Sequence, residues 1–324
     1  MIAVTGGAGF IGSGIIWELN RIGLTDILVP EEMDRLGVEK KANLRNLKIN
    51  RLIDHYEFLK GFENGDFNLD CIFHLGACSA TTETDRNYIM ATNYEYTRRL
   101  ASIATEKGVR LIYASSAATY GDGSKGFSDQ ESLLKNFTPM NYYGESKHLF
   151  DLWALENGLF KEIVGLKYFN VYGPNEYHKG DMRSFIIRAF ELIGDTGGLR
   201  LFKSENPDYS DGGQKRDFIY LKDAVDITMF FYDHPSIGGI YNAGTGMART
   251  WNDLALAIFD ALKKEAKINY IPLPDVLKDQ YQYYTEADIS KLEKAGYGGC
   301  NYTLEDGVAD YITGYLNSNR RLIP

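Results

Sequence analysis

The chain has few of the residues that mark several classes of protein. Its three cysteines form no C-x-x-C pair, and its five histidines are scattered with no acidic cluster beside them. A disulfide scaffold and a metal site are therefore not expected. The chain also lacks a signal peptide before its first strand and any run of 18 apolar residues. We therefore expect a cytoplasmic protein that has no membrane partner.

Basic residues are fewer than acidic ones. The chain has 35 Lys and Arg and 44 Asp and Glu, which gives a formal net charge of −9. Nucleic acid binding needs a basic face, so a nucleic-acid partner is not expected. A hydrophobic content of 44% and a charged content of 24% are typical of a folded soluble protein. A length of 324 residues allows two lobes that share a core.

The strongest feature present is the first segment of the chain. A short apolar strand, residues 2–5, runs directly into a G-x-x-G-x-x-G turn at Gly6, Gly9 and Gly12. Apolar residues then recur at helical spacing from Ile11 to Leu19. Glycines at a strand-to-helix turn let the backbone approach a pyrophosphate at the N-terminus of the helix. The segment predicts a dinucleotide-binding site.

Strand and helix patterns alternate through the first half, which predicts an α/β fold with a Rossmann-type doubly wound parallel sheet. A smaller α/β substrate-binding lobe is expected to follow. We expect the dinucleotide-binding domain in residues 1–170, with segments near 216–244 returning to it, and the second lobe mainly in 171–324. The expected strands are residues 2–5, 27–29, 71–74, 111–114, 163–168, 240–242 and 268–271, and the expected helices are about 85–107, 143–159, 183–194 and 303–317. Residues 30–50 show no clear element.

Tyr143 and Lys147 form a Y-x-x-x-K pair at the start of a predicted helix, so they project from one face. A phenol has a pKa of about 10 and must approach about 7 to act as a base, a change of about 4 kcal/mol. One ammonium at about 4 Å contributes about 4 kcal/mol at an effective dielectric of about 20. Lys147 is therefore expected to lower the pKa of Tyr143.

Ser116 follows a predicted strand in the segment YASSAATYG, residues 113–121. A hydroxyl at this place can hold a substrate hydroxyl within reach of Tyr143. The alternative is that Ser116 only satisfies backbone groups at the end of the strand.

With these motifs the chain resembles the extended short-chain dehydrogenases/reductases, which include nucleotide-sugar epimerases and dehydratases. Within that family it is similar to the epimerases of ADP-linked heptoses. The segments that carry this similarity are MIAVTGGAGFIGS at the start, FHLGACSATTE (73–83), YASSAATYG (113–121), NYYGESK (141–147), KYFNVYGPNEYHKGDM (167–182), KRDFIY (215–220) and YQYYTEADI (281–289).

The resemblance implies inversion at C6″ of an ADP-heptose substrate, a step in lipopolysaccharide precursor synthesis, by a homo-oligomer such as a pentamer. The C–H bond of a secondary alcohol cannot be deprotonated directly, so transient oxidation to a ketone by a tightly bound, recycled NADP is expected. Tyr143 is expected on one side of that ketone and Lys179, from an H-K-G loop, on the other. Lys179 could instead be a solvated loop lysine or pair with a phosphate.

The resemblance also assigns binding residues. The cofactor would contact Gly6, Gly9, Phe10, Ile11, Gly12, Glu31, Glu32, Lys40, Leu75, Gly76, Ala77, Asn93, Tyr143 and Lys147. The substrate would contact Ser79, Ser116, Asn170, Lys179, Lys203, Arg216 and Tyr281. For the residues outside the catalytic motifs, a structural role is an equal alternative.

One stretch departs from the family pattern. The second strand ends in Pro30-Glu31-Glu32, where these epimerases have an aspartate followed by asparagine. Glu31 could bind ribose hydroxyls and favour NAD, and two carboxylates would repel a 2′-phosphate. Lys40 and Lys41 could compensate, so we expect NADP, with NAD as the alternative and no metal.

Two other functions fit parts of the pattern. A C4″ epimerase of UDP-sugars would share the glycine turn and the Y-x-x-x-K pair, and a nucleotide-sensing protein without turnover would share the fold. The strand end Ser-Ser-Ala-Ala-Thr lacks the Asp-Glu pair that a dehydratase needs. The presence of serine, tyrosine and lysine together argues against an inactive protein.

Overall fold

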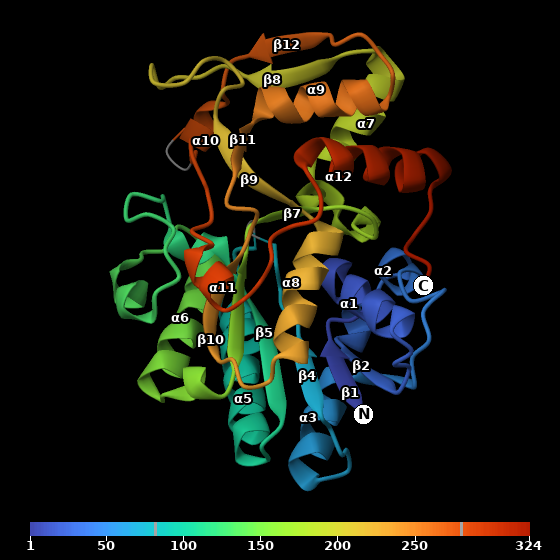
Figure 1. The fold of residues 1–324 in the computed structure, drawn as a ribbon, viewed down its shortest axis with the longest axis vertical. Helices are drawn as coiled ribbons and strands as arrows, with labels where there is room; N and C mark the ends of the chain where they lie inside the picture. The colour runs from blue at the N-terminus through green and yellow to red at the C-terminus, as the bar shows by residue number, and fades with distance from the viewer. Residues whose placement is uncertain (81–82, 279–280) are drawn as a thin grey trace.

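A seven-stranded parallel sheet forms the centre of the protein (Figure 1). The computed structural model describes residues 1–80, 83–278 and 281–324, so Thr81 and Thr82 of the segment 73–83 lie outside the described residues. The strands lie in the order β10 (Gly239–Ala243), β6 (Val164–Tyr168), β5 (Arg110–Ser116), β4 (Cys71–His74), β1 (Ile2–Thr5), β2 (Ile27–Glu31) and β3 (Arg51–Asp54). The strand order reverses between β1 and β4, and ligands of such sheets bind in the crevice at the carboxyl ends of the strands there.

Helices cover both faces of this sheet, which is why its central strands are buried apolar runs. One face packs against α1 (Phe10–Arg21) and α8 (Leu221–Asp233). The other packs against α3 (His55–Asn64), α5 (Tyr96–Glu106) and α6 (Tyr142–Glu156). All four residues of β1 and all five of β2 are buried. The sheet is therefore a rigid support for the residues at its carboxyl edge.

The second lobe lies over the carboxyl edge of the sheet, at the top of Figure 1. It has a three-stranded sheet in the order β11-β9-β7 and a parallel pair, β8 and β12. Its own core packs most of these strands against three helices, α7 (Phe185–Thr196), α9 (Trp251–Ala261) and α12 (Leu304–Asp310). The strands are β7 (Asn170–Tyr172), β8 (Leu199–Phe202), β9 (Lys215–Tyr220), β11 (Ala248–Thr250) and β12 (Ile268–Ile271). Two short helices follow β12, α10 (Asp275–Lys278) and α11 (Ser290–Lys294), and α11 contacts β10 of the large sheet.

The chain crosses between the lobes more than once. After β9 it returns to the large sheet as α8 and β10, and β10 pairs in parallel with β6. It then leaves again for the second lobe at β11. A division of the chain at residue 170 remains a prediction.

Three expectations about local structure need correction. The expected helix at 303–317 runs as α12, a π-helical segment at Tyr311–Tyr315 and a 3₁₀ turn at Leu316–Ser318. Residues 30–50 were expected to hold no element, but they contain the end of β2, a 3₁₀ turn at Met33–Arg35 and α2 (Val38–Ala42). The expected helix at 85–107 is helical from Arg86, but it runs as α4 (Arg86–Ile89), a π-helical segment at Met90–Glu95 and then α5. A π segment displaces one side chain from the helical register, and π segments often accompany functional sites.

No helix among the described residues combines the length and apolar character needed to span a membrane. Within the same residues, no cluster of His, Cys, Asp and Glu could hold a metal ion.

Candidate active site

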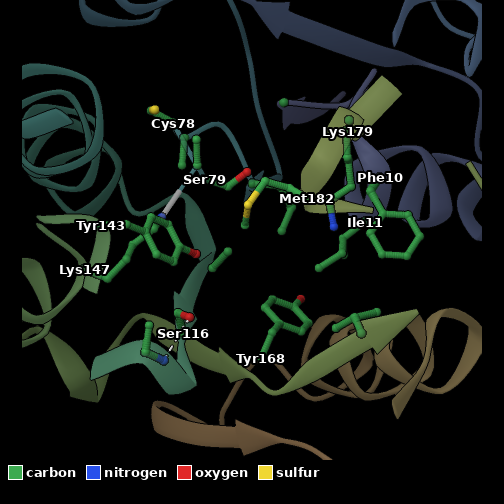
Figure 2. Close-up of a pocket in the computed structure, with 18 of the residues that line it drawn as sticks. Phe10, Ile11, Cys78, Ser79, Ser116, Tyr143, Lys147, Tyr168, Lys179 and Met182 are labelled. Carbon is green, nitrogen blue, oxygen red and sulfur yellow. Dashed lines mark hydrogen bonds between the residues drawn. The ribbon is translucent and has the colours of Figure 1, made fainter. Parts of the chain in front are cut away.

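A cavity of about 820 Å³ lies between the carboxyl edge of the large sheet and the second lobe. Its lining includes most of the site residues expected from the sequence (Figure 2). These are Gly6, Gly9, Phe10, Ile11, Gly12, Glu31, Glu32, Lys40, Leu75, Gly76, Ala77, Ser79, Ser116, Tyr143, Lys147, Asn170 and Lys179. Segments far apart in the sequence therefore meet around one space.

The glycine turn fits a dinucleotide pyrophosphate. Gly6 has φ +67°, and a Cβ there would lie 2.7 Å from the backbone N of Gly76. A Cβ on Gly12 would overlap the carbonyl oxygen of Gly6. Helix α1 starts at Phe10 without a side-chain cap, so its first N–H groups remain available at the cavity wall. Helix N-termini of this kind bind phosphate.

A buried hydrogen-bond chain fixes the neighbouring turn after β4. The N–H of Gly76 donates to the Thr5 hydroxyl (3.2 Å), which lies 2.6 Å from Nδ1 of His74. Nε2 of His74 lies 2.8 Å from Oγ1 of Thr97, which itself donates to the carbonyl of Asn93. Burial lowers the pKa of His74 to about 3, so the imidazole is neutral and links its neighbours through hydrogen bonds alone.

The end of β2 holds two carboxylates that are both already paired. Glu31 is buried, with one oxygen accepting from the N–H of Ala8 (2.7 Å) and the other from Nζ of Lys40 (2.7 Å). Glu32 accepts from the Tyr88 hydroxyl (2.8 Å) and pairs with Arg35 (3.2 Å). Lys41 is exposed and does not line the cavity. The negative charge that the sequence suggested at this place is therefore largely balanced by Lys40 and Arg35.

Tyr143 and Lys147 lie on the cavity side of α6, and Ser116 lies at the end of β5 (Figure 2). Asn141 caps α6 by accepting from the N–H of Gly144 (2.8 Å), which sets where the helix begins. Oγ of Ser116 accepts from the N–H of Ala118 (3.1 Å). The Ser-Tyr-Lys group proposed for catalysis thus comes from two adjacent regular elements, β5 and α6.

The expected fall in the pKa of Tyr143 is not seen. Burial raises the pKa of Tyr143, and a hydrogen bond from Ser116 only partly opposes the rise. Burial also lowers the pKa of Lys147 to about 8, against the opposing field of Asp151. The sequence argument neglected burial, which disfavours both the phenolate and the ammonium.

Asp151 belongs to a buried polar cluster beneath these residues. Its carboxylate accepts from Lys167 (2.8 Å), Ser115 (2.7 Å) and Tyr113 (2.8 Å), and Lys167 also donates to Thr119 (2.6 Å). Asp151 and Lys167 have no exposed side-chain surface. The cluster ties β5, β6 and α6 together directly below Ser116. Sequence reasoning missed it, although the position of Asp151, four residues after Lys147, was a visible signal.

Lys179 lies on the opposite side of the cavity from Tyr143, beside Phe10 and Ile11 (Figure 2). Its Nζ lies 4.9 Å from the centroid of the Phe10 ring. Burial lowers the pKa of Lys179, while Glu176 opposes that change. A partly buried lysine in a cavity wall is not a solvated loop lysine, so that alternative loses its support.

Four expected site residues do not line the cavity. Asn93 is buried in the π-helical segment, where it accepts from the N–H of Cys78 (2.8 Å) and donates to its carbonyl (2.9 Å). Lys203 is exposed. Arg216 and Tyr281 lie together, with the guanidinium 5.6 Å from the Tyr281 ring and 5.9 Å from the ring of Trp251, which does line the cavity. Their roles in binding remain predictions.

This geometry, a dinucleotide cradle beside a Ser-Tyr-Lys group, defines the class of protein. Residues 2–244 match the NAD dependent epimerase/dehydratase family, and the chain belongs to that family. A curated relative from Nitratidesulfovibrio vulgaris, named ADP-L-glycero-D-manno-heptose-6-epimerase, is 49% identical over 318 residues, 98% of each chain. A relative of the same name from Fusobacterium nucleatum is 45% identical over 329 residues, again 98% of each chain.

A solved structure has the same architecture. The crystal structure of ADP-L-glycero-D-manno-heptose-6-epimerase from Helicobacter pylori matches with a TM-score of 0.81 and 30% identity, covering 97% of this chain and 95% of the other. The expected fold class and the expected resemblance are both confirmed.

Proposed function

We propose that this protein is an isomerase that converts ADP-D-glycero-D-manno-heptose to ADP-L-glycero-D-manno-heptose by inversion at C6″. The observation that carries the proposal is the pair of relatives with this name, 49% and 45% identical over 98% of the chain. The cavity supports it, since it places a phenol and a lysine on opposite walls. Inversion of a carbon needs an acid/base group on each side of the intermediate carbonyl.

The glycine turn and the cavity wall around Leu75 and Gly76 would hold a nicotinamide cofactor, which would supply reversible hydride transfer at C6″ when bound. Ser116 would hydrogen-bond the sugar oxygen and keep it next to the phenol of Tyr143. Tyr143 would accept the hydroxyl proton as the ketone forms and return a proton as the alcohol reforms. Lys147, one helical turn away, would place its positive charge beside that proton transfer.

Lys179 would act as the acid/base group after the sugar has turned to its second orientation. After oxidation the C6″ carbonyl must present its other face, which moves its oxygen towards the opposite wall of the cavity. There Lys179 can donate a proton to that oxygen, and its low exposure strengthens the interaction. Lys179 as a phosphate contact is the alternative.

We further propose NADP as the cofactor. Lys40 lines the cavity and places an ammonium next to Glu31, where a 2′-phosphate would otherwise meet an unbalanced carboxylate. We expect a cytoplasmic homo-oligomer whose product enters lipopolysaccharide synthesis.

The test is incubation of the purified protein with ADP-D-glycero-D-manno-heptose, without added cofactor, followed by proton NMR of the product. Appearance of the L-glycero epimer is the expected result. A parallel sample with UDP-glucose tests the C4″ alternative. Conversion of UDP-glucose, with the heptose unchanged, would overturn the proposal.

A further inference from the structure

Three segments that are distant in the sequence meet at two buried asparagines, Asn43 and Asn175, which we call the asparagine hub. Nδ2 of Asn43 donates to the carbonyl of Ala8 in the glycine turn (3.0 Å) and to that of Asn175 (2.9 Å). The same amide lies 3.3 Å from Nδ1 of His178. Oδ1 of Asn43 accepts from Nε of Arg321, near the end of the chain (3.2 Å). One side chain therefore contacts the cofactor turn, the loop that carries Lys179 and the C-terminal segment.

Asn175 completes the hub from the other side. It is fully buried with φ 76°, a left-handed conformation that is uncommon outside glycine. Its Nδ2 donates to the hydroxyl of Ser13 on α1 (3.0 Å), and its Oδ1 accepts from the N–H of Leu322 (3.1 Å). Such a conformation persists where the surroundings fix it. The start of the loop is therefore held at α1, in addition to the hydrogen bonds within the loop from Ser184 to the Glu176 carboxylate.

The asparagine hub connects the glycine turn with the loop that carries Lys179. Both backbone polar groups of Ala8 are hydrogen-bonded, because its N–H donates to Glu31 and its carbonyl accepts from Asn43. Lys40, three residues before Asn43, pairs with the same Glu31. Lys179 is four residues after Asn175 and lies beside Phe10 at the start of α1. A shift in the cofactor turn would therefore be transmitted to the Lys179 loop through two hydrogen bonds.

We propose that Asn43 and Asn175 are positioning residues that couple occupation of the dinucleotide site to the placement of the Lys179 loop. The consequence for catalysis rests on the proposed function, in which Lys179 serves one sugar orientation. The coupling itself is a property of the fold and is measurable without the heptose.

The experiment measures amide hydrogen exchange of residues 176–183 in the full chain, first after removal of any copurified dinucleotide and then after saturation with NADPH, and in parallel with NADH. In the unaltered protein we expect the bound dinucleotide to slow exchange in this loop about tenfold. In Asn43→Ala the loop should exchange about tenfold faster without dinucleotide, and the slowing on binding should be lost. The dissociation constant of the dinucleotide should rise about tenfold, because binding must then order the turn and the loop separately.

Arg321→Ala is a second, milder variant in case Asn43→Ala does not fold. It removes one hydrogen bond to Asn43, an ion pair with Glu39 (2.6 Å) and a contact with the ring of Tyr177 in the loop (5.1 Å to the ring centroid). We expect loop exchange to rise about threefold. Arg99→Ala is the matched control, since Arg99 pairs with Glu63 on the outer helices α5 and α3, away from the cavity.

Unchanged exchange of residues 176–183 in both Asn43→Ala and Arg321→Ala would overturn the coupling. Failure to convert the heptose would overturn the proposed function and leave this measurement unaffected. The two proposals can therefore fail separately.

Discussion

The two walls of the cavity are built in different ways. Tyr143, Lys147 and Ser116 stand on α6 and β5, above the buried Asp151–Lys167 pair. Lys179 stands on a loop that is held by contacts with α1, α2 and the C-terminal segment. The first wall owes its geometry to helix spacing and strand ends, whereas the second depends on long-range contacts. Substitutions in the first wall should therefore have large and local effects on activity or stability. Substitutions in the second wall should have smaller effects, which depend on the segments that hold its loop.

The largest expected effect is on the first wall. Tyr143→Phe removes the group that we propose accepts and returns the proton, so epimerisation should fall by about 10²–10⁴-fold while the cofactor stays bound. Tyr142→Phe is the matched control, because Tyr142 is the preceding residue and is exposed. In both variants, product formation is measured by NMR and cofactor content by absorbance. Near-normal turnover would remove Tyr143 from the mechanism.

The support of that wall can be tested through stability. Asp151→Asn leaves the buried Lys167 without its counter-charge, which should lower the free energy of unfolding by about 3–5 kcal/mol. Removal of the more exposed Arg321–Glu39 pair by Glu39→Gln should cost about 0–1 kcal/mol. Urea unfolding followed by circular dichroism measures both variants. Equal losses would contradict the difference drawn between the two walls.

The second wall should show a directional defect. Lys179→Ala removes the proposed proton donor for one sugar orientation, so reduction of the ketone on that side should slow by about 10²-fold. The rate is measured from each pure epimer labelled at C6″, so that the two directions of the reaction are followed separately. Lys161→Ala, at an exposed position, controls for a loss of positive charge. Kinetics of Lys179→Ala that match the unaltered protein would remove Lys179 from the mechanism, whereas a rise in KM with unchanged kcat would favour the phosphate contact.

The pH dependence should be governed by the first wall. Burial lowers the pKa of Lys147 to about 8, so its ammonium form is lost as the pH rises through that value. Burial raises the pKa of Tyr143, and only its phenolate can accept the hydroxyl proton, so deprotonation of Tyr143 should raise turnover as the pH rises. Loss of the Lys147 ammonium opposes that rise, so turnover should level off above about pH 8. In Lys147→Arg the guanidinium stays charged, and the pH–rate profile should continue to rise above about pH 8.

The smallest expected effect is on cofactor choice. Lys40→Ala should weaken NADP binding about fivefold and leave NAD binding nearly unchanged, since only NADP has a 2′-phosphate to pair with the ammonium. Lys41→Ala is the neighbouring control, because Lys41 does not line the cavity. Dissociation constants for both dinucleotides give the result. A strong preference of the unaltered protein for NAD would contradict the proposed cofactor.

Local patterns in the sequence were sufficient wherever one element carries the geometry. The glycine turn at Gly6, the pairing of Tyr143 with Lys147 and the apolar strands β1, β2, β4, β5 and β6 all follow from local sequence patterns. Strand β3 was not predicted, because only one of its four residues is buried. Local patterns failed at α2, where a five-residue helix has too short an apolar repeat to be recognised. They also misjudged the pKa of Tyr143, since burial is a property of the packed chain.

The amino-acid sequence by itself determined the fold class, the dinucleotide turn and the spacing of Tyr143 and Lys147, because these depend on residues within one or two turns of backbone. Only the tertiary structure decided that Glu31 is balanced by Lys40, that Asp151 is buried against Lys167, and that Asn43 joins Ala8 to Asn175. The last of these contacts spans 132 positions of the chain. A hydrogen bond at such separation depends on how the whole chain packs, which no local pattern of residues records.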